Sequence, residues 1–317
     1  MLWMTGTLFS FMGMAVGGRE LSQELGTFQI LFFRSLIGLV ILGLILFHNG
    51  WHLVKTRHFS LHLLRNISHF GGQFGWFYGI AYIPLVEVFA IEFTLPVWTA
   101  ILAAIILKEQ LKLSRIFAII LGILGMLVIL RPGMGVLNPV SLIVLAAAIC
   151  YGLSHTLTRR MILFDHPITI LFYMTLIQLP IGLFFSYKGW TSVSFSMWPW
   201  LLIVGTAALT AHYCMARALA IADVTVVVPL DFLRLPLIAV IGYLFYDEMI
   251  DLFVLIGALI MLLGNFISIR AEHKSKKASY KLHFHIFNQL CPPYCKGIFR
   301  SSDLSCEKEK TPHLSRR

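Results

Sequence analysis

The segment from Ala81 to Glu109 (AYIPLVEVFAIEFTLPVWTAILAAIILKE) is long enough to cross a membrane, yet its apolar part contains two carboxylates and a proline. These residues are Glu87, Glu92 and Pro96. A charged side chain at the centre of a bilayer costs about 2.5–3.5 kcal/mol on insertion scales, so it is usually paired or lies on a transport pathway. The segment therefore constrains the fold strongly, because its acids need partners inside the membrane.

A second segment, from Ala220 to Glu248 (AIADVTVVVPLDFLRLPLIAVIGYLFYDE), has the same arrangement. Sliding the sequence by 139 positions places Glu92 on Asp231 and Glu109 on Glu248. An offset of 140 likewise places FQILFFRSLIGL, at 28–39, on ITILFYMTLIQL, at 168–179. Two matches at nearly one offset indicate a chain made of two similar halves.

The composition is that of a helical membrane protein, with 58% hydrophobic and only 13% charged residues. The apolar runs are continuous over about 20 residues and do not alternate with a period of two, which favours helices over a barrel. We predict an all-α, polytopic fold with ten transmembrane helices, at 2–18, 27–47, 69–84, 86–107, 115–131, 139–158, 167–186, 197–217, 223–245 and 252–270. Because each half then has an odd number of spans, the second half is inverted relative to the first, as in many secondary transporters.

The halves define the expected domains: a five-helix repeat at 1–137, a second at 138–270 and a basic, disordered cytoplasmic tail at 271–317. Lys and Arg are more frequent in loops that face the cytoplasm. With both termini cytoplasmic, nine basic residues fall on the inside and three, Arg19, Arg131 and Lys188, on the outside. This bias predicts a multi-pass protein with both termini inside.

The net charge of +10 does not indicate nucleic-acid binding, because the tail beyond Arg270 carries ten basic and four acidic residues. The five cysteines form no disulfide framework, and no cleavable signal peptide is evident. No phosphate-binding loop, nucleophile elbow or metalloprotease motif is present. We therefore predict no enzyme, cofactor or metal; the expected partners are the lipid bilayer and a small-molecule substrate, and a homodimer remains open.

Four charged residues are the main candidates for a substrate site. Arg34 and Glu92 lie at similar depth in the outer third of their spans, where they either neutralise one another or bind the two charges of a zwitterion. Asp231, the counterpart of Glu92, is expected in the inner third, with Arg234 on the same helix face. That pair either contacts substrate or only makes insertion tolerable.

Other residues carry weaker predictions. Aromatic and histidine side chains at Tyr78, Trp98 and His212 are further candidates for lining the site. Gly71, Gly75 and Gly79 form overlapping GxxxG patterns, which predict a face packed closely on another helix. We expect Glu87 to be a solvated vestibule residue, prolines to unwind the helices locally, and Glu109 and Glu248 to position the helices that follow them.

The sequence resembles the EamA family of the drug/metabolite transporter superfamily. The resemblance rests on ILFFRSLIGL at 30–39, AYIPLVEVFAIEFTLPVW at 81–98, LKEQLKLSRIFAIILGILGMLVILRPG at 107–133 and the weaker copy at 246–265. It implies a secondary carrier whose pathway lies between spans 1–4 and 6–9, with spans 5 and 10 peripheral. The FFRSL block and the acidic fourth span look most like bacterial S-adenosylmethionine uptake transporters.

We therefore predict a transporter in the bacterial inner membrane that moves a small polar or zwitterionic metabolite, with S-adenosylmethionine as a candidate, by alternating access. Two alternatives remain. One is an exporter of amino acids or drugs with the same fold, and the other is a non-transporting membrane enzyme or scaffold.

Overall fold

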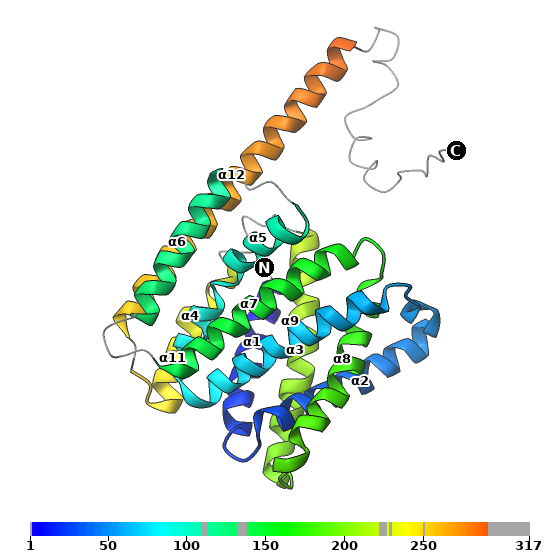
Figure 1. The fold of residues 1–317 in the computed structure, drawn as a ribbon, viewed down its shortest axis with the longest axis vertical. Helices are drawn as coiled ribbons and strands as arrows, with labels where there is room; N and C mark the ends of the chain where they lie inside the picture. Colours follow the sequence, from blue (N-terminus) through cyan, green and yellow to red (C-terminus); the bar gives the residue numbers. More distant parts are fainter. Residues whose placement is uncertain are drawn as a thin grey trace. The chain divides into compact units, whose positions relative to one another are not determined.

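The structure is a computed structural model and describes residues 2–108, 113–131, 138–221, 227, 230–249 and 251–290. Over these residues the regular structure consists of helices, with short connections and no strand (Figure 1). The helices are α1 (Leu2–Leu21), α2 (Thr27–Asn49), η1 (Trp51–Val54), α3 (Phe59–Tyr82), α4 (Leu85–Glu92), α5 (Leu95–Ile106), α6 (Leu113–Leu130), α7 (Pro139–Met161), α8 (Pro167–Ser186), η2 (Tyr187–Gly189), η3 (Phe195–Met197), α9 (Trp198–Ile221), α11 (Arg234–Tyr246) and α12 (Leu252–Leu290).

The described helices account for all ten expected spans when α4 and α5 are counted as one interrupted span. Six spans are both long and apolar enough to cross a membrane by length and composition, and α11 is a shorter apolar helix. The prediction of an all-helical, polytopic fold is confirmed. The chain divides into two compact units, Met1–Ile269 and Arg270–Arg317. Helix is also assigned to residues 270–290, where the sequence suggests disorder, and the rest of the tail lies outside the described residues.

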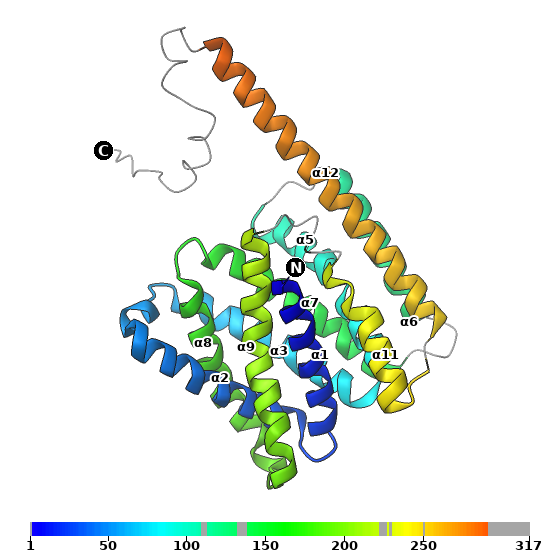
Figure 2. The same cartoon turned by 180° about the vertical axis from the view of Figure 1, so that it is seen from behind.

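The helix pairs of the first unit follow the exchange symmetry of an inverted repeat. Exchanging the halves converts α1 into α7 and α3 into α9, and both α3–α7 and α1–α9 are extensive contacts, the latter seen in Figure 2. The same exchange maps the α2–α8 pair onto itself, and these two helices are also in contact. The two halves are therefore interleaved rather than packed side by side.

The contact between α6 and α12 shows the same symmetry at individual residues (Figure 1). A Cβ built on Gly125 would lie 2.5 Å from the carbonyl oxygen of Gly257, so the two backbones touch there. The repeat counterparts of these residues, Gly264 and Ala118, also face one another, because a Cβ on Gly264 would lie 3.2 Å from the Ala118 carbonyl oxygen. Small residues thus allow the fifth and tenth spans to pack closely along their backbones.

Both halves interrupt a helix at the same repeat position. α4 ends at Glu92 and α5 begins at Leu95, whereas α11 begins at Arg234, three residues after Asp231. The residues at the two interruptions, Phe93 and Phe232, are repeat counterparts, and their rings stack with centroids 4.1 Å apart and planes 12° apart. The two helix breaks therefore meet face to face in the interior of the first unit.

The third span starts earlier than predicted. α3 begins at Phe59, ten residues before the expected start at residue 69, and its first turns bury the polar residues His62, Arg65 and Asn66. Their polarity suggested an inside loop. The burial succeeds because these side chains find partners elsewhere in the fold: His62 Nε2 lies 3.0 Å from Oδ2 of Asp165, in the α7–α8 connection, and Arg65 Nε donates to Oγ1 of Thr158 on α7.

The small face of α3 packs against α7, as the GxxxG patterns predict. A Cβ on Gly75 would lie 2.7 Å from the Ala147 Cβ and 2.8 Å from the Ile143 carbonyl oxygen. Gly79 meets Val144, and Gly71 meets Cys150. Because backbone atoms of α7 limit the space at Gly75, even one methyl group requires the helices to separate.

Replacement of Gly75 by alanine tests this packing. We expect Gly75→Ala to lower the stability of the purified protein by about 1–3 kcal/mol through overpacking, measured as an earlier thermal unfolding midpoint. Gly43→Ala is the matched control, because a Cβ at Gly43 would meet no atom within 4 Å. Equal unfolding midpoints for the two variants would contradict a close α3–α7 contact.

Candidate functional site

A cavity of about 160 Å³ lies among helices of both halves, near the stacked helix breaks. Its lining combines aromatic, cationic, acidic and amide side chains. The lining residues are Phe11, Met14, Arg34, His69, Gln73, Trp76, Phe77, Glu92, Leu95, Tyr151, His155, His212, Met215, Asp231 and Arg234. Among these, none comes from α6 or α12, as the resemblance implied for spans 5 and 10.

One buried arginine connects the acids of the two halves. Arg234 Nη2 donates to Asp231 Oδ2 at 2.6 Å, and Arg234 Nη1 donates to Glu92 Oε1 at 3.4 Å. Trp76 Nε1 donates to the other oxygen of Glu92 at 2.8 Å. With two carboxylates and one guanidinium, the ionised cluster carries a net charge of −1.

Aromatic rings enclose the guanidinium of this cluster. Its Cζ lies 4.4 Å from the ring centroid of Phe11 and 5.1 Å from that of Phe93. Such cation–π contacts strengthen when water is excluded. One acid oxygen, Asp231 Oδ1, is buried and has no hydrogen-bond partner among the described residues. The cluster therefore retains a free acceptor beside the cavity.

The expected separation of the two acids in depth is wrong. Glu92 and Asp231 contact the same guanidinium, so they do not occupy opposite thirds of the membrane. The depth estimate assumed two unbroken helices that enter from opposite faces. Because both helices are interrupted next to their acid, each carboxylate instead lies at a helix break where the halves meet.

Arg34 and Glu92 do not form the ion pair that the sequence allowed. Arg34 on α2 is only 5% exposed, and no acidic side chain of the described residues lies within ion-pairing distance of it. Its Nε is buried without a hydrogen-bond partner among those residues. Gln73 also lines the cavity, and its Nε2 and Oε1 atoms are likewise buried without a hydrogen-bond partner among the described residues. Buried polar atoms without partners are rare in proteins and call for an explanation such as a ligand.

The other candidate residues are divided between the cavity and the surrounding helices. His212 lines the cavity. Tyr78 lies between the rings of Phe74 and Tyr82, and Trp98 Nε1 donates to Thr94 Oγ1 at 3.0 Å; neither Tyr78 nor Trp98 lines the cavity.

Sequence reasoning missed several lining residues. Phe11, Tyr151 and His69 read as ordinary apolar or core residues in their helices. Only their convergence from α1, α7 and α3 gives them a common role. No group of His, Cys, Asp and Glu suited to hold a metal occurs in the described part of the chain.

Glu248 connects elements of both halves away from the cavity. Its carboxylate accepts a hydrogen bond from Arg19 Nη2 at 2.5 Å and from the Leu85 N–H, the first of α4, at 2.8 Å. Burial raises the pKa of the Glu248 carboxyl, while the Leu85 N–H and the charge of Arg19 act in the opposite direction. Glu248 was expected to position the following helix. It instead contacts α4 at its N-terminus, where an anion is favourable. Its repeat counterpart, Glu109, lies outside the described residues.

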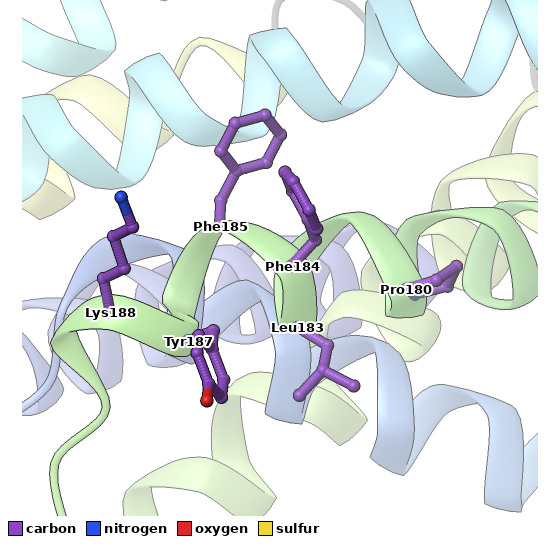
Figure 3. A pocket seen from close by; sticks show the side chains of 6 residues that line it. All are labelled: Pro180, Leu183, Phe184, Phe185, Tyr187 and Lys188. Carbon is purple, nitrogen blue, oxygen red and sulfur yellow. The ribbon is translucent and has the colours of Figure 1, made fainter.

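A larger surface hollow, of about 660 Å³, lies over the end of α8 (Figure 3). Figure 3 shows Phe184 and Phe185 on one side of the helix and Leu183 and Tyr187 on the other, with Lys188 beyond them. Exposed aromatic residues and a lysine at a helix end are typical of a membrane–water interface. The lining of this hollow has a single charge, at Lys188, so it lacks the mixed charges of the cavity.

Comparison with known proteins identifies the fold. The model of the EamA-like transporter family matches residues 1–131 and again residues 138–270. The chain belongs to this family. It is a multi-pass membrane transporter for a small molecule, which agrees with a charged cavity between two inverted halves.

The relatives of this EamA-like transporter are named for different solutes. An S-adenosylmethionine uptake transporter of Rickettsia felis is 25% identical over 279 residues, which cover 88% of this chain and 95% of the relative. A riboflavin transporter of Brucella anthropi is 29% identical and covers 68% and 78% of the two chains. The pseudopaline exporter CntI of Pseudomonas aeruginosa is 22% identical, with 81% and 90% covered. A solved crystal structure shares the fold, with a TM-score of 0.59 at 15% identity over 83% of this chain and 96% of its own.

Removal of Arg234 tests the charge cluster. Arg234→Met leaves Glu92 and Asp231 close together without a cation, and loss of one partner of a buried ion pair costs about 3–5 kcal/mol. We therefore expect a much lower thermal unfolding midpoint for the purified variant.

Neutralising the acids as well provides the control. The triple variant Arg234→Met, Glu92→Gln and Asp231→Asn should recover much of the lost stability, because no charge of the cluster then remains buried and unpaired. Lys188→Met, at an exposed position in η2 just after α8, should unfold like the unmodified protein. A stable Arg234→Met protein would show that the cluster is not ionised as described.

Proposed function

We propose that this protein is a secondary transporter that moves a small zwitterionic metabolite across a bacterial inner membrane by alternating access. The observation that carries this proposal is the meeting of Glu92 and Asp231, one from each half, at Arg234 beside a cavity. A site between inverted repeats at broken helices is typical of secondary transporters. Contacts made by both halves give the solute a means of influencing their relative positions.

S-adenosylmethionine is the solute we favour. The acidic cluster has a net charge of −1 and a free oxygen on Asp231, which suits a solute with cationic sulfonium and ammonium groups. Rings of Trp76, Phe77 and Tyr151 line the same cavity and offer flat surfaces for a nucleobase. Relatives named for S-adenosylmethionine uptake also match along most of both chains.

The size of the cavity supports alternating access. Its volume of about 160 Å³ is below the roughly 300–1,000 Å³ of pockets that enclose drug-sized ligands. The helices must therefore move apart before a nucleoside-sized solute enters. On the predicted outer side, the Arg19–Glu248 pair joins the ends of α1 and α11 to the start of α4, so opening to that side requires its separation.

Transport by purified protein in liposomes tests the proposal directly. We expect liposomes preloaded with unlabelled S-adenosylmethionine to accumulate the radiolabelled compound by exchange, and riboflavin to compete weakly. Absence of exchange for S-adenosylmethionine would remove it as the substrate. Absence of exchange for a wider panel of metabolites would revive the alternative of a non-transporting enzyme or scaffold.

Glu92 provides a mutational prediction. Glu92→Gln removes the negative charge of the first half, so we expect accumulation of solute to be abolished while membrane insertion is retained. Uptake and membrane abundance should be measured together in cells and in liposomes. Glu87→Gln is the matched control on the same helix: Glu87 accepts a hydrogen bond from Ser141 Oγ and is not part of the cavity lining. Normal uptake by Glu92→Gln would refute the assigned role.

Export is the second candidate function, because one relative is named as an exporter. The same fold serves both directions. Sensitivity of a deletion strain to amino acids or toxic compounds would favour export, whereas dependence of that strain on an external metabolite would favour uptake.

A further inference from the structure

A second buried arginine, Arg65 on α3, lies near Arg34. Arg65 is 6% exposed and lies one helical turn before His69, which lines the cavity together with Arg34. Within the described residues Arg65 bonds only neutral oxygens: Nη1 donates to Asn66 Oδ1 at 2.7 Å, and Nε donates to Thr158 Oγ1 at 3.1 Å. The described part of the chain therefore buries two neighbouring cations without an ion-pairing acid.

The side chains around these arginines add hydrogen-bond donors rather than negative charge. Gln178 Nε2 donates to the backbone oxygen of Asn66. The same nitrogen lies 3.1 Å from His69 Nδ1, and because an amide nitrogen can only donate, Nδ1 is the acceptor. Neutral His69 then carries its proton on Nε2. His69 and Arg34 are both lining residues of the cavity, so this N–H belongs to a residue of the same lining.

An unpaired buried cation is costly, and two adjacent ones cost more because they repel. A bound anion would relieve both costs. Arginine matches a carboxylate especially well, because its planar group forms two parallel N–H···O bonds. The partnerless Nε–H of Arg34 is available for this type of contact.

We infer that Arg34, together with His69 and with Arg65 one turn before His69 on α3, forms a carboxylate-binding subsite for the transported solute. This inference rests on the proposed transport function and deepens it, because it assigns the anionic half of the zwitterion. The cationic half would bind at Glu92 and Asp231, which make no ion pair with Arg34. The opposite charges of the two subsites then fix the orientation of the solute in the cavity.

A first experiment uses simple anions and the purified full-length protein. Thermal unfolding is measured in acetate, phosphate and chloride at constant ionic strength and pH. We expect acetate to raise the unfolding midpoint above that in chloride, because a ligand of the folded state stabilises it. No effect of acetate, or stabilisation by phosphate alone, would overturn the carboxylate subsite.

Variants locate the effect at Arg34. Arg34→Gln should lose the response to acetate, while Lys188→Gln, which removes an exposed charge, should keep it. If Arg34→Gln fails to fold, Arg34→Lys serves instead: it keeps the charge but loses the two-bond geometry, so we expect about tenfold weaker acetate binding, equivalent to about 1.4 kcal/mol. A full response in either Arg34 variant would contradict the inference.

A second experiment separates this inference from the proposed substrate. Binding of S-adenosylmethionine is compared with binding of its decarboxylated form. We expect at least about tenfold weaker binding without the carboxylate. Glu92→Gln should weaken both ligands and preserve their ratio, whereas Arg34→Gln should bring the ratio close to one.

The outcomes of the two experiments are distinguishable. Equal binding of the two forms by the unmodified protein would overturn the subsite and leave S-adenosylmethionine transport intact. Failure of both forms to bind, together with an acetate response that depends on Arg34, would reject that substrate and support the subsite.

Discussion

The contact of one arginine with an acid from each half is the interaction on which this architecture depends. Inside a membrane, Glu92 and Asp231 are tolerable only when a cation compensates them, and Arg234 does this for both. The cation belongs to the second half alone, because the residue of the first half that matches Arg234 is Leu95. The halves are similar in backbone but not in charge, so the ionised cluster is left with a net negative charge.

Helix breaks make this contact geometrically possible. If both helices were unbroken and entered the membrane from opposite faces, Glu92 and Asp231 would lie at different depths. The interruptions at Phe93 and Phe232 allow two repeat counterparts to stack on one another and bring the neighbouring acids together. Irregular backbone at membrane depth is tolerated where protein or a polar cavity surrounds it. The position of the breaks beside the cavity satisfies that condition.

The acidic and the basic side chains at the cavity come from different helices. The acidic cluster lies where α4 and α11 meet, whereas Arg34 and Arg65 come from α2 and α3. The Arg19–Glu248 pair, away from the cavity, couples the end of α1 to the start of α4. We propose that solute charge and closure are linked through α4, the short helix that carries Glu92 at one end and receives Glu248 at the other.

Much of this could be predicted from the sequence, and the failures have identifiable causes. The equivalence of Glu92 and Asp231 followed from the repeat, and the close packing of Gly71, Gly75 and Gly79 followed from their spacing. Arg65 was assigned to a loop, because its neighbours are polar and partners such as Thr158 lie far along the chain. Tyr78 follows two lining residues in sequence but lies outside the cavity, since successive helical residues point about 100° apart.

The sequence by itself determined the membrane class, the helical spans and the presence of two related halves, because hydropathy and periodicity are local properties of the chain. Only the tertiary structure decided which charges meet. The partners of Arg34, Glu92 and Asp231 depend on where the helices break and how they cross, and those features arise from contacts between residues separated by more than a hundred positions. The sequence thus specified the charges that the membrane must accommodate, and the packing of the helices decided which of them compensate one another and which remain available to a solute.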